Sequence, residues 1–321
     1  MKLLVRATIA AVVSLLGSSA FAQDYPTRPV RFIVPFPAGG PTDIIARHIA
    51  LRLTDMLGQQ FIVENRGGAN GTIGTNIVAK ANPDGYTLLL TASGPVASGL
   101  ALYQSVPYDP VRDFTPITPV AKSNIVLVSG AKFPAQTFQE LISAAKEKPT
   151  GVSAELNTIG SIHHLLTALL SQRTGAKLLL IPYKGSGPAI IDLIGGHVDI
   201  GFESVPGVIA FIRNNQLRAY AVASDERLQT LPDVPTLKEL GLQEFVAEPW
   251  FAVLAPAGTS KDVIDKLSAA LAKIARMEAI KEQFASQGMI PDWMSPEDTS
   301  RFLASEVARW ATIVKETGAK M

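Results

Sequence analysis

Short apolar segments alternate with amphipathic ones along most of the chain, and this alternation constrains its fold more than any other feature. Residues 30–35 and 61–64 have the composition of buried strands. Between them, apolar residues recur at helical spacing from Ile44 to Met56, and Gly58 follows as a stop signal. Strands that alternate with helices predict an α/β fold of largely parallel sheets flanked by helices.

The same alternation of strands and helices continues to the end of the chain. Thr137 and Glu140 form a capping box that opens a helix to Lys148, and Ser161 precedes an apolar helical stripe. Further strands are expected at 86–91, 177–182, 199–203 and 217–223, and further helices at 74–81, 188–194 and from 259 and 295 onward.

The length of 321 residues predicts about two domains. No low-complexity linker separates them, so the two lobes are expected to share crossover strands, for which 125–129 and 250–255 are the candidates. The expected division is a signal peptide at 1–22, lobe 1 at 23–124 and 246–321, and lobe 2 at 125–245.

The first 22 residues have the pattern of a secretory signal peptide. Lys2 and Arg6 precede the apolar residues 7–16, and Ala20-Phe21-Ala22 is a small-x-small cleavage site. The apolar core is shorter than the ~20 residues that a membrane-spanning helix needs. We expect cleavage after Ala22 and a periplasmic protein without membrane insertion.

Composition removes several classes of function. The chain has no cysteine, which excludes disulfides, thiolate metal sites and thiol nucleophiles. Lys and Arg total 29 against 28 Asp and Glu, without a run of basic residues. Nucleic-acid binding is therefore not expected.

Catalytic and cofactor motifs are incomplete. Residues 69–74 resemble a dinucleotide fingerprint, but its first glycine and the later acidic residue are missing. Two S-x-x-K matches, at Ser129 and Ser143, lack their companion elements. No histidine has a second ligand at metal-binding spacing on one helix face. We expect no cofactor, no metal and no enzyme activity, with a secreted hydrolase as the alternative.

Four strand–turn–helix junctions carry the positive signal. They lie at 37–43, 92–95, 158–161 and 185–188, and each places small or hydroxyl residues before a helix start. Unpaired amide N–H groups and the helix dipole favour an anion at such a position. Four junctions in one exported chain predict capture of a small anion between two lobes by neutral donors. Lys184, directly before the fourth junction, is the one cation that this turn offers.

The chain resembles the Bug receptors, which are solute-binding proteins related to tripartite tricarboxylate transporters. The resemblance covers essentially the whole mature chain. It rests on Tyr25–Val30, Pro35–Asp43, Glu64–Gly71, Asn82–Thr87, Pro182–Gly185, Gly195–Asp199, Leu231–Thr236 and Leu254–Thr259.

This resemblance implies a two-lobed Venus-flytrap fold of the periplasmic-binding-protein type, with a carboxylated ligand in the cleft. Family members often have Asp where this chain has Glu203, which leaves amino-acid binding in doubt, and Ala168 stands where Glu is common. The ligand contacts that it implies are Phe36, Ala38, Gly39, Gly40, Thr42, Asp43, Asn70, Ala92, Ser93, Thr158, Ile159, Gly160, Ser161, His164, Lys184, Gly185, Ser186, Gly187 and Glu203.

The sequence thus predicts a monomeric periplasmic receptor that binds a small carboxylate for the membrane subunits of a tripartite tricarboxylate-type transporter. A ligand sensor without a transport role is a further alternative. Aliphatic, aromatic and amino-acid carboxylates all remain open.

Overall fold

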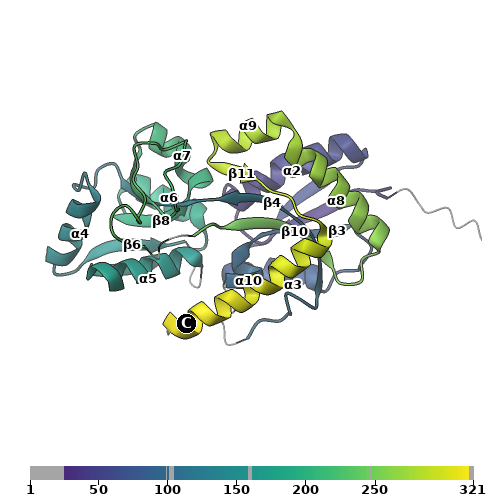
Figure 1. The fold of residues 1–321 in the computed structure, drawn as a ribbon, viewed down its shortest axis with the longest axis horizontal. Helices are drawn as coiled ribbons and strands as arrows, with labels where there is room; N and C mark the ends of the chain where they lie inside the picture. Colours follow the sequence, from purple (N-terminus) through teal and green to yellow (C-terminus); the bar gives the residue numbers. More distant parts are fainter. Residues whose placement is uncertain are drawn as a thin grey trace, which may run out of the picture.

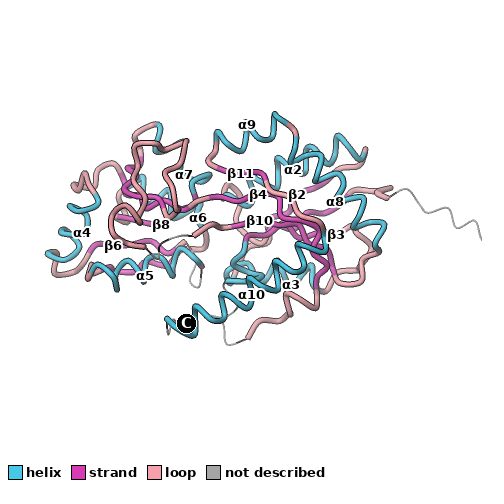
Figure 2. Tube along the Cα trace, viewed as in Figure 1, coloured by secondary structure: helices cyan, strands magenta, loops and turns pink. Residues whose placement is uncertain are grey.

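The computed structural model describes residues 25–98, 100, 105–157, 161–243, 245 and 247–317. The predicted signal peptide lies outside the described residues. Two lobes lie side by side along the long axis of the molecule, each built on one β-sheet with helices on its faces (Figure 1). Figure 2 shows the strands β4 and β10 extending from the larger lobe toward the smaller one.

The larger lobe contains the first part and the last part of the chain. Its six-stranded sheet has the order β11-β4-β10-β3-β1-β2. The strands are β1 (Val30–Val34), β2 (Phe61–Asn65), β3 (Thr87–Ala92), β4 (Phe114–Ser123), β10 (Trp250–Pro256) and β11 (Met289–Pro291).

The smaller lobe is formed by the middle of the chain. Its five-stranded sheet has the order β7-β6-β8-β5-β9. The strands are β5 (Ile125–Gly130), β6 (Val152–Leu156), β7 (Leu178–Pro182), β8 (Ile200–Ser204) and β9 (Leu217–Val222).

The sheets are mixed rather than largely parallel, which corrects one detail of the sequence prediction. The strands β2, β1 and β3 pair in parallel, and so do β7, β6 and β8. Every pairing made by β4, β5 and β10 is antiparallel. These strands carry the chain into or out of a lobe, so they enter each sheet without a crossover helix and run against its parallel strands.

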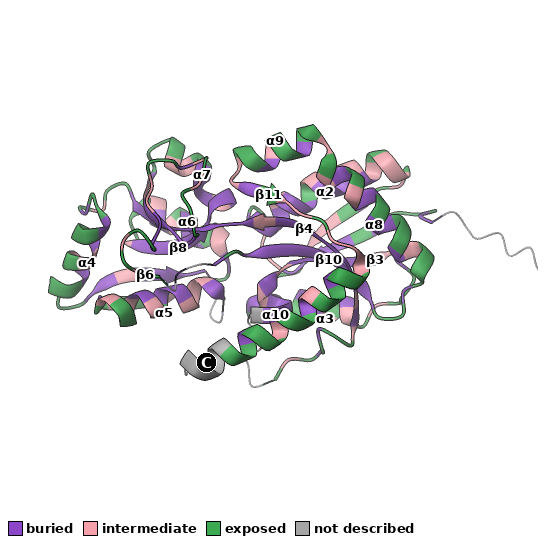
Figure 3. Ribbon diagram, in the orientation of Figure 1, coloured by how far each residue is buried: buried purple, intermediate pink, exposed green. Residues whose placement is uncertain are grey.

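Helices cover both sheets, with exposed outer faces over buried strands (Figure 3). In the larger lobe, α2, α8 and α9 share a core with one sheet face, while α3, η2 and α10 pack on the other. The helices are α2 (Pro41–Leu57), η1 (Ala69–Gly71), α3 (Thr72–Ala79), η2 (Gly94–Ser98), α4 (Phe138–Glu147), α5 (Ile162–Thr174), α6 (Ser186–Gly195), α7 (Val205–Arg213), α8 (Lys261–Arg276), α9 (Glu278–Ser286) and α10 (Pro296–Thr317).

Helix starts follow the local chemistry, with one shift. Thr137 and Ser161 accept hydrogen bonds from the amides of Glu140 and His164, as N-caps do. The polar residues Thr42 and Asp43 are candidate caps of α2 by residue type, but the helix begins before them, with Gly40 as N-cap and Pro41 in the first position. Proline is favoured there because its missing N–H would have no partner in the helix.

The chain passes between the lobes at two places. Asn124 joins β4 to β5, and residues 247–249 lead back to β10. The two passages are hydrogen-bonded to each other, since the Ser123 amide donates to the Pro249 carbonyl at 2.9 Å. The lobe boundaries expected near residues 124 and 246 stay a prediction. Within the described ranges, no helix is long and apolar enough to cross a membrane.

Candidate functional site

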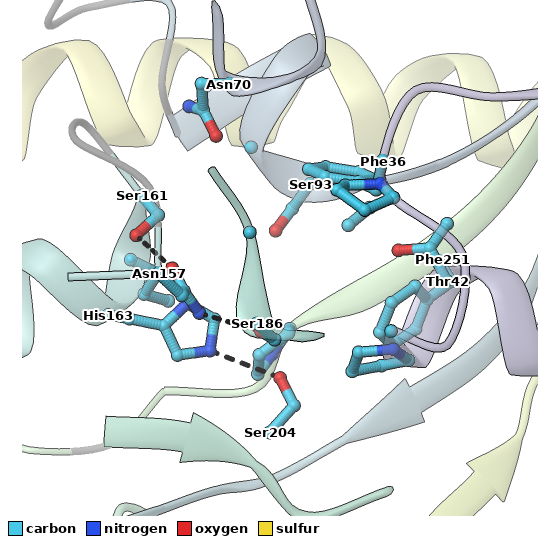
Figure 4. Close-up of a pocket in the computed structure, with 18 of the residues that line it drawn as sticks. Phe36, Thr42, Asn70, Ser93, Asn157, Ser161, His163, Ser186, Ser204 and Phe251 are labelled. Atoms are coloured by element: carbon cyan, nitrogen blue, oxygen red, sulfur yellow. Dashed lines mark hydrogen bonds between the residues drawn. The ribbon is translucent and has the colours of Figure 1, made fainter. Parts of the chain in front are cut away.

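A cavity lies between the lobes, beside the passages that join them. It contains about 650 Å³ of empty space, part of which opens to solvent, and both lobes line it (Figure 4). The lining residues are Phe36, Pro37, Gly40, Pro41, Thr42, Asn70, Ala92, Ser93, Gly94, Asn157, Ser161, Ile162, His163, Gly185, Ser186, Gly187, Ser204, Pro249 and Phe251.

Four helices direct their N-termini at this cavity. Thr42 lies in the first turn of α2, and Ser161, Ser186 and Ser204 lie at the starts of α5, α6 and α7. The first amide N–H groups of a helix have no partner within it, and the macrodipole makes this end positive. The positive ends of four helix dipoles therefore meet at the cavity.

In the larger lobe, a rigid loop forms the cavity wall. The Asn65 side chain donates to the Phe36 carbonyl at 3.1 Å and to Asp43 Oδ1 at 3.0 Å. The Gly39 amide and Arg47 Nε donate to Asp43 Oδ2 at 2.9 and 3.0 Å. Burial alone would raise the pKa of Asp43, but these hydrogen bonds hold that pKa below its usual value. Asp43 thus stays ionised and fixes the loop.

In the smaller lobe, side chains form a connected polar network. Ser161 Oγ donates to Asn157 Oδ1 at 3.1 Å, and Asn157 Nδ2 donates to Ser186 Oγ at 3.1 Å. Both serines line the cavity, and Figure 4 shows them on either side of Asn157. The network fixes both hydroxyl groups at the cavity wall, and it leaves the hydroxyl proton of Ser186 available for another acceptor.

His163 is the histidine of the cavity. Its Nε2 lies 3.2 Å from Ser204 Oγ, while its Nδ1 is buried without a hydrogen-bond partner. Burial lowers the pKa of His163 to about 4. The ring is neutral at physiological pH and supplies no positive charge.

Among the lining residues that the structure describes, none is lysine or arginine. Phe36, Phe251, Pro249 and Ile162 form apolar wall on the other sides. A ligand held here would meet neutral hydrogen-bond donors at one side and hydrocarbon at the other.

The lobes touch across the cavity. A Cβ atom added to Gly185 would come within 3.0 Å of the Pro37 ring, so only glycine lets these two turns approach so closely. On the other side of the molecule, Arg213 of α7 donates to the Ser286 carbonyl at the end of α9 at 2.9 Å. The structure is therefore a closed arrangement of the two lobes.

The structure brings ten of the sequence-predicted residues to the cavity. They are Phe36, Gly40, Thr42, Asn70, Ala92, Ser93, Ser161, Gly185, Ser186 and Gly187. Three others, Thr158, Ile159 and Gly160, lie outside the described residues.

The remaining six predicted residues do not line the cavity. Ala38, Gly39 and Asp43 belong to the loop that supports its wall, and Lys184 precedes the turn that reaches it. His164 follows His163 on α5 and is turned away by one helical step. Glu203 is fully buried, beneath the cavity floor.

The prediction missed several lining residues, which fall into two groups. Asn157, His163 and Ser204 are polar, and each ends a strand or begins a helix beside a predicted residue, so the junction rule could have found them. Phe251 and Pro249 come from the second passage between the lobes. Nothing local in the sequence marks them, because the crossover topology alone brings them to the cavity.

No group of three or more potential metal ligands occurs among the described residues. The residues around the cavity offer backbone amides, hydroxyls and two amide side chains, those of Asn70 and Asn157. Such donors suit an anionic organic ligand better than a cation.

Comparison with known proteins identifies the family. The family model described as "Tripartite tricarboxylate transporter family receptor" matches residues 45–319. The chain belongs to this receptor family. Protein BugT of Bordetella pertussis is 46% identical over 307 residues, which cover 95% of this chain and 94% of that protein.

Solved structures of this receptor family share the fold. The periplasmic binding protein BugD is 37% identical, with a TM-score of 0.87 over 92% of this chain and 100% of that chain. R. palustris Rpa4515 with adipate is 34% identical, with a TM-score of 0.89 over the same shares of the two chains. The predicted family and the two-lobed periplasmic-binding-protein fold are confirmed.

Proposed function

We propose that this receptor captures a small carboxylate in the periplasm and delivers it to the membrane subunits of a tripartite tricarboxylate-type transporter. The observation that carries the proposal is the convergence of four helix N-termini on one cavity without a lysine or arginine in its described lining. Amide and hydroxyl donors at such positions hold a carboxylate through charge-assisted hydrogen bonds.

The family supports the chemical class of the ligand. Rpa4515, whose fold this chain shares, was solved with adipate, a dicarboxylate. In this chain, the cavity between the lobes receives hydrogen-bonding groups from both of them. Its apolar wall, with Phe36 and Phe251, suits the hydrocarbon part of such an acid.

A hydrolase is the alternative that one contact favours, because Ser204 and His163 form a serine–histidine pair in the cavity. The pair lacks the rest of a catalytic arrangement. His163 Nδ1 has no partner to orient the ring, and a pKa of about 4 makes the ring a weak base at neutral pH. We therefore assign no enzyme activity to this site.

Thermal unfolding of the mature protein with a carboxylate panel tests the proposal. Adipate, succinate, malate, citrate and benzoate form the panel, with the uncharged diol 1,6-hexanediol as the control for adipate. At least one acid should raise the melting temperature in a concentration-dependent way, as ligand linkage requires. Stabilisation by no acid, or hydrolysis of an ester panel abolished by Ser204→Ala, would contradict the proposal.

Two further measurements test location and movement. Protein exported from a Gram-negative host should have the mass of a chain that begins at Gln23. Small-angle scattering should show a smaller radius of gyration when ligand is added, because a ligand that contacts both lobes stabilises their closed arrangement. A retained leader or an unchanged radius at saturation would count against these two parts.

A further inference from the structure

Two carboxylic acids lie inside the smaller lobe, beneath the floor of the cavity. Glu155 on β6 and Glu203 on β8 are 1% and 0% exposed. The parallel register pairs Glu155 with Gly201, which is two residues before Glu203. Side chains alternate along a strand, so both acids point to the same face of the sheet. We call these two residues the acid pair.

The fold makes room for the acid pair. A Cβ atom at position 201 would collide with the Glu155 side chain, so glycine there leaves space for the acid. A lobe interior is ordinarily filled with apolar groups, and burying an acid without a partner costs free energy. Space reserved for an acid therefore indicates a function other than stability.

Among the described residues, no cationic side chain lowers the pKa of either acid. Two titratable side chains lie near the acid pair. The charge of Glu155 helps to raise the pKa of Tyr183, whose hydroxyl donates to Asp192, and His163 on α5 contacts Ser204, the residue after Glu203. Neither acid takes part in an ion pair or a hydrogen bond of ordinary geometry within the described residues. On β5, Glu203 has apolar Val126 as its register partner.

Burial sets the charge of the acid pair. It raises the pKa of Glu203 to about 7, against the effect of the nearby Ser186 and Asn157 side chains and the Ser204 backbone. Burial raises the pKa of Glu155 well above its usual value, and the charge of Glu203 raises it further. Burial thus disfavours the ionised form of both acids, and Glu203 gains or loses its proton near neutral pH.

Ser186 connects the acid pair to the cavity. Its Oγ accepts a hydrogen bond from Asn157, so its own hydroxyl proton has two possible directions, toward Glu203 or into the cavity. An ionised Glu203 attracts this proton, whereas a protonated Glu203 leaves it for a bound anion. Figure 4 shows Ser186 beside Asn157 and near Ser204 at the cavity floor.

We propose that the acid pair links carboxylate capture to proton uptake. The site then selects anionic ligands that place no positively charged group of their own near the smaller lobe. The inference rests on the proposed function and specifies its ligand class. A carboxylate binds the form with Glu203 protonated, because the negative charge beneath the floor is then absent and Ser186 donates into the cavity. An α-ammonium group at the same place would instead require ionised Glu203.

Titration calorimetry from pH 6 to pH 9 tests this proposal, with the tightest-binding acid among adipate, succinate and malate. The dissociation constant should rise about tenfold over this range, since a one-unit increase in the pKa of Glu203 on binding is a tenfold change in affinity. Heats measured in HEPES and in Tris at pH 7.5 should differ by the uptake of a fraction of a proton.

Two variants locate the effect. Glu203→Gln cannot ionise, so its affinity should stay within about twofold from pH 6 to pH 9 and no proton should be taken up. Glu239→Gln is the matched control in the same lobe, because Arg227 holds the pKa of this exposed carboxyl at about 2 and Glu239 is ionised throughout the range. This control should keep the wild-type pH dependence.

The possible outcomes distinguish failure of the acid-pair proposal from failure of the proposed function. Binding that is tight but independent of pH in the wild-type protein overturns the proposed role of the acid pair and leaves the proposed function intact. Release of a proton, or aspartate binding more tightly than succinate, overturns it in favour of an ammonium site. If none of the acids binds at any pH, the proposed function fails and this inference fails with it. The wild-type measurement decides even if Glu203→Gln does not fold.

Discussion

The two halves of the cavity keep buried carboxyl groups in opposite states. In the larger lobe, Asp43 receives hydrogen bonds from Gly39, Arg47 and Asn65 and remains ionised. In the smaller lobe, Glu155 and Glu203 lie at least as deep, and burial is the main influence on both. Their pKa values rise, although the Ser186 and Asn157 side chains and the Ser204 backbone act against the rise at Glu203. A buried carboxyl group therefore stays ionised only where its hydrogen bonds and a neighbouring cation outweigh the cost of burial.

This difference assigns separate tasks to the two lobes. The ionised Asp43 holds the loop 36–40 in a fixed shape, and its own charge is compensated by Arg47. The acid pair has no compensating charge and can respond to what enters the cavity. One lobe therefore supplies a rigid wall, and the other supplies a floor whose charge depends on pH.

Asp43→Ala removes the carboxylate that fixes the cavity wall of the larger lobe, and it should have the largest effect on stability. It should lower the free energy of unfolding by about 3 kcal/mol, since a hydrogen bond to a charged group contributes roughly 1.5–3 kcal/mol. Chemical denaturation at pH 7 measures this. The loss should shrink as pH falls below 3.8 and through the lowered pKa of Asp43, because protonation removes the same interactions.

Asp55→Ala is the control for that experiment, because Asp55 lies on the same helix with a side chain 58% exposed and only a 3.8 Å pair with Arg52. Its effect should stay within about 0.5 kcal/mol, as exposed ion pairs contribute little. Equal stability of the two variants would show that the loop does not depend on Asp43.

Glu203→Gln tests the floor through stability. The folded state holds the Glu203 proton more tightly than the unfolded state, so this residue lowers the free energy of unfolding as pH rises from 4.5 to about 7. The slope is at most about 1.4 kcal/mol per pH unit. The free energy of unfolding of the variant, measured relative to that of the wild type by denaturation, should rise by about 2 kcal/mol from pH 5 to pH 8. A constant difference at both pH values would mean that Glu203 is ionised in the fold.

Ser161→Ala and Ser93→Ala each remove one hydroxyl group from opposite sides of the cavity. Each should weaken carboxylate binding by about tenfold to a hundredfold, at 1.4 kcal/mol per factor of ten. Ser161→Ala should also cost about 1 kcal/mol of stability, because this serine caps α5. Calorimetry measures the affinities, with Ser300→Ala on α10 as the control. Unchanged affinity in both variants would move the binding site elsewhere.

A chelator should have the smallest effect, which is none. The donors around the cavity are amides and hydroxyls, and the described residues contain no metal-binding cluster. Affinity measured with and without EDTA should agree within error. Binding that disappears with EDTA would require a metal bridge between ligand and protein.

Local sequence signals predicted the helices and strands whose ends are marked by capping residues or turn residues. The start of α5 at the Ser161 cap and the end of α2 at Gly58 followed from capping chemistry alone. The four junctions were recognisable because a helix that follows a strand needs a tight turn with small residues. Signals of this kind lie within a few residues of the structure that they specify, so a single sequence displays them.

The mixed sheets, the choice of His163 over His164 and the position of Glu203 depended on contacts between distant segments. β10 reaches the sheet between β3 and β4 after more than a hundred residues spent in the other lobe, and it brings Phe251 to the cavity. Glu203 differs from a surface glutamate only because β6, β8 and α6 enclose it. The sequence by itself determined where helices and strands begin, since caps and periodicity act over one or two turns. Tertiary structure decided which carboxyl groups stay charged, since that depends on which donors distant segments bring within hydrogen-bonding distance.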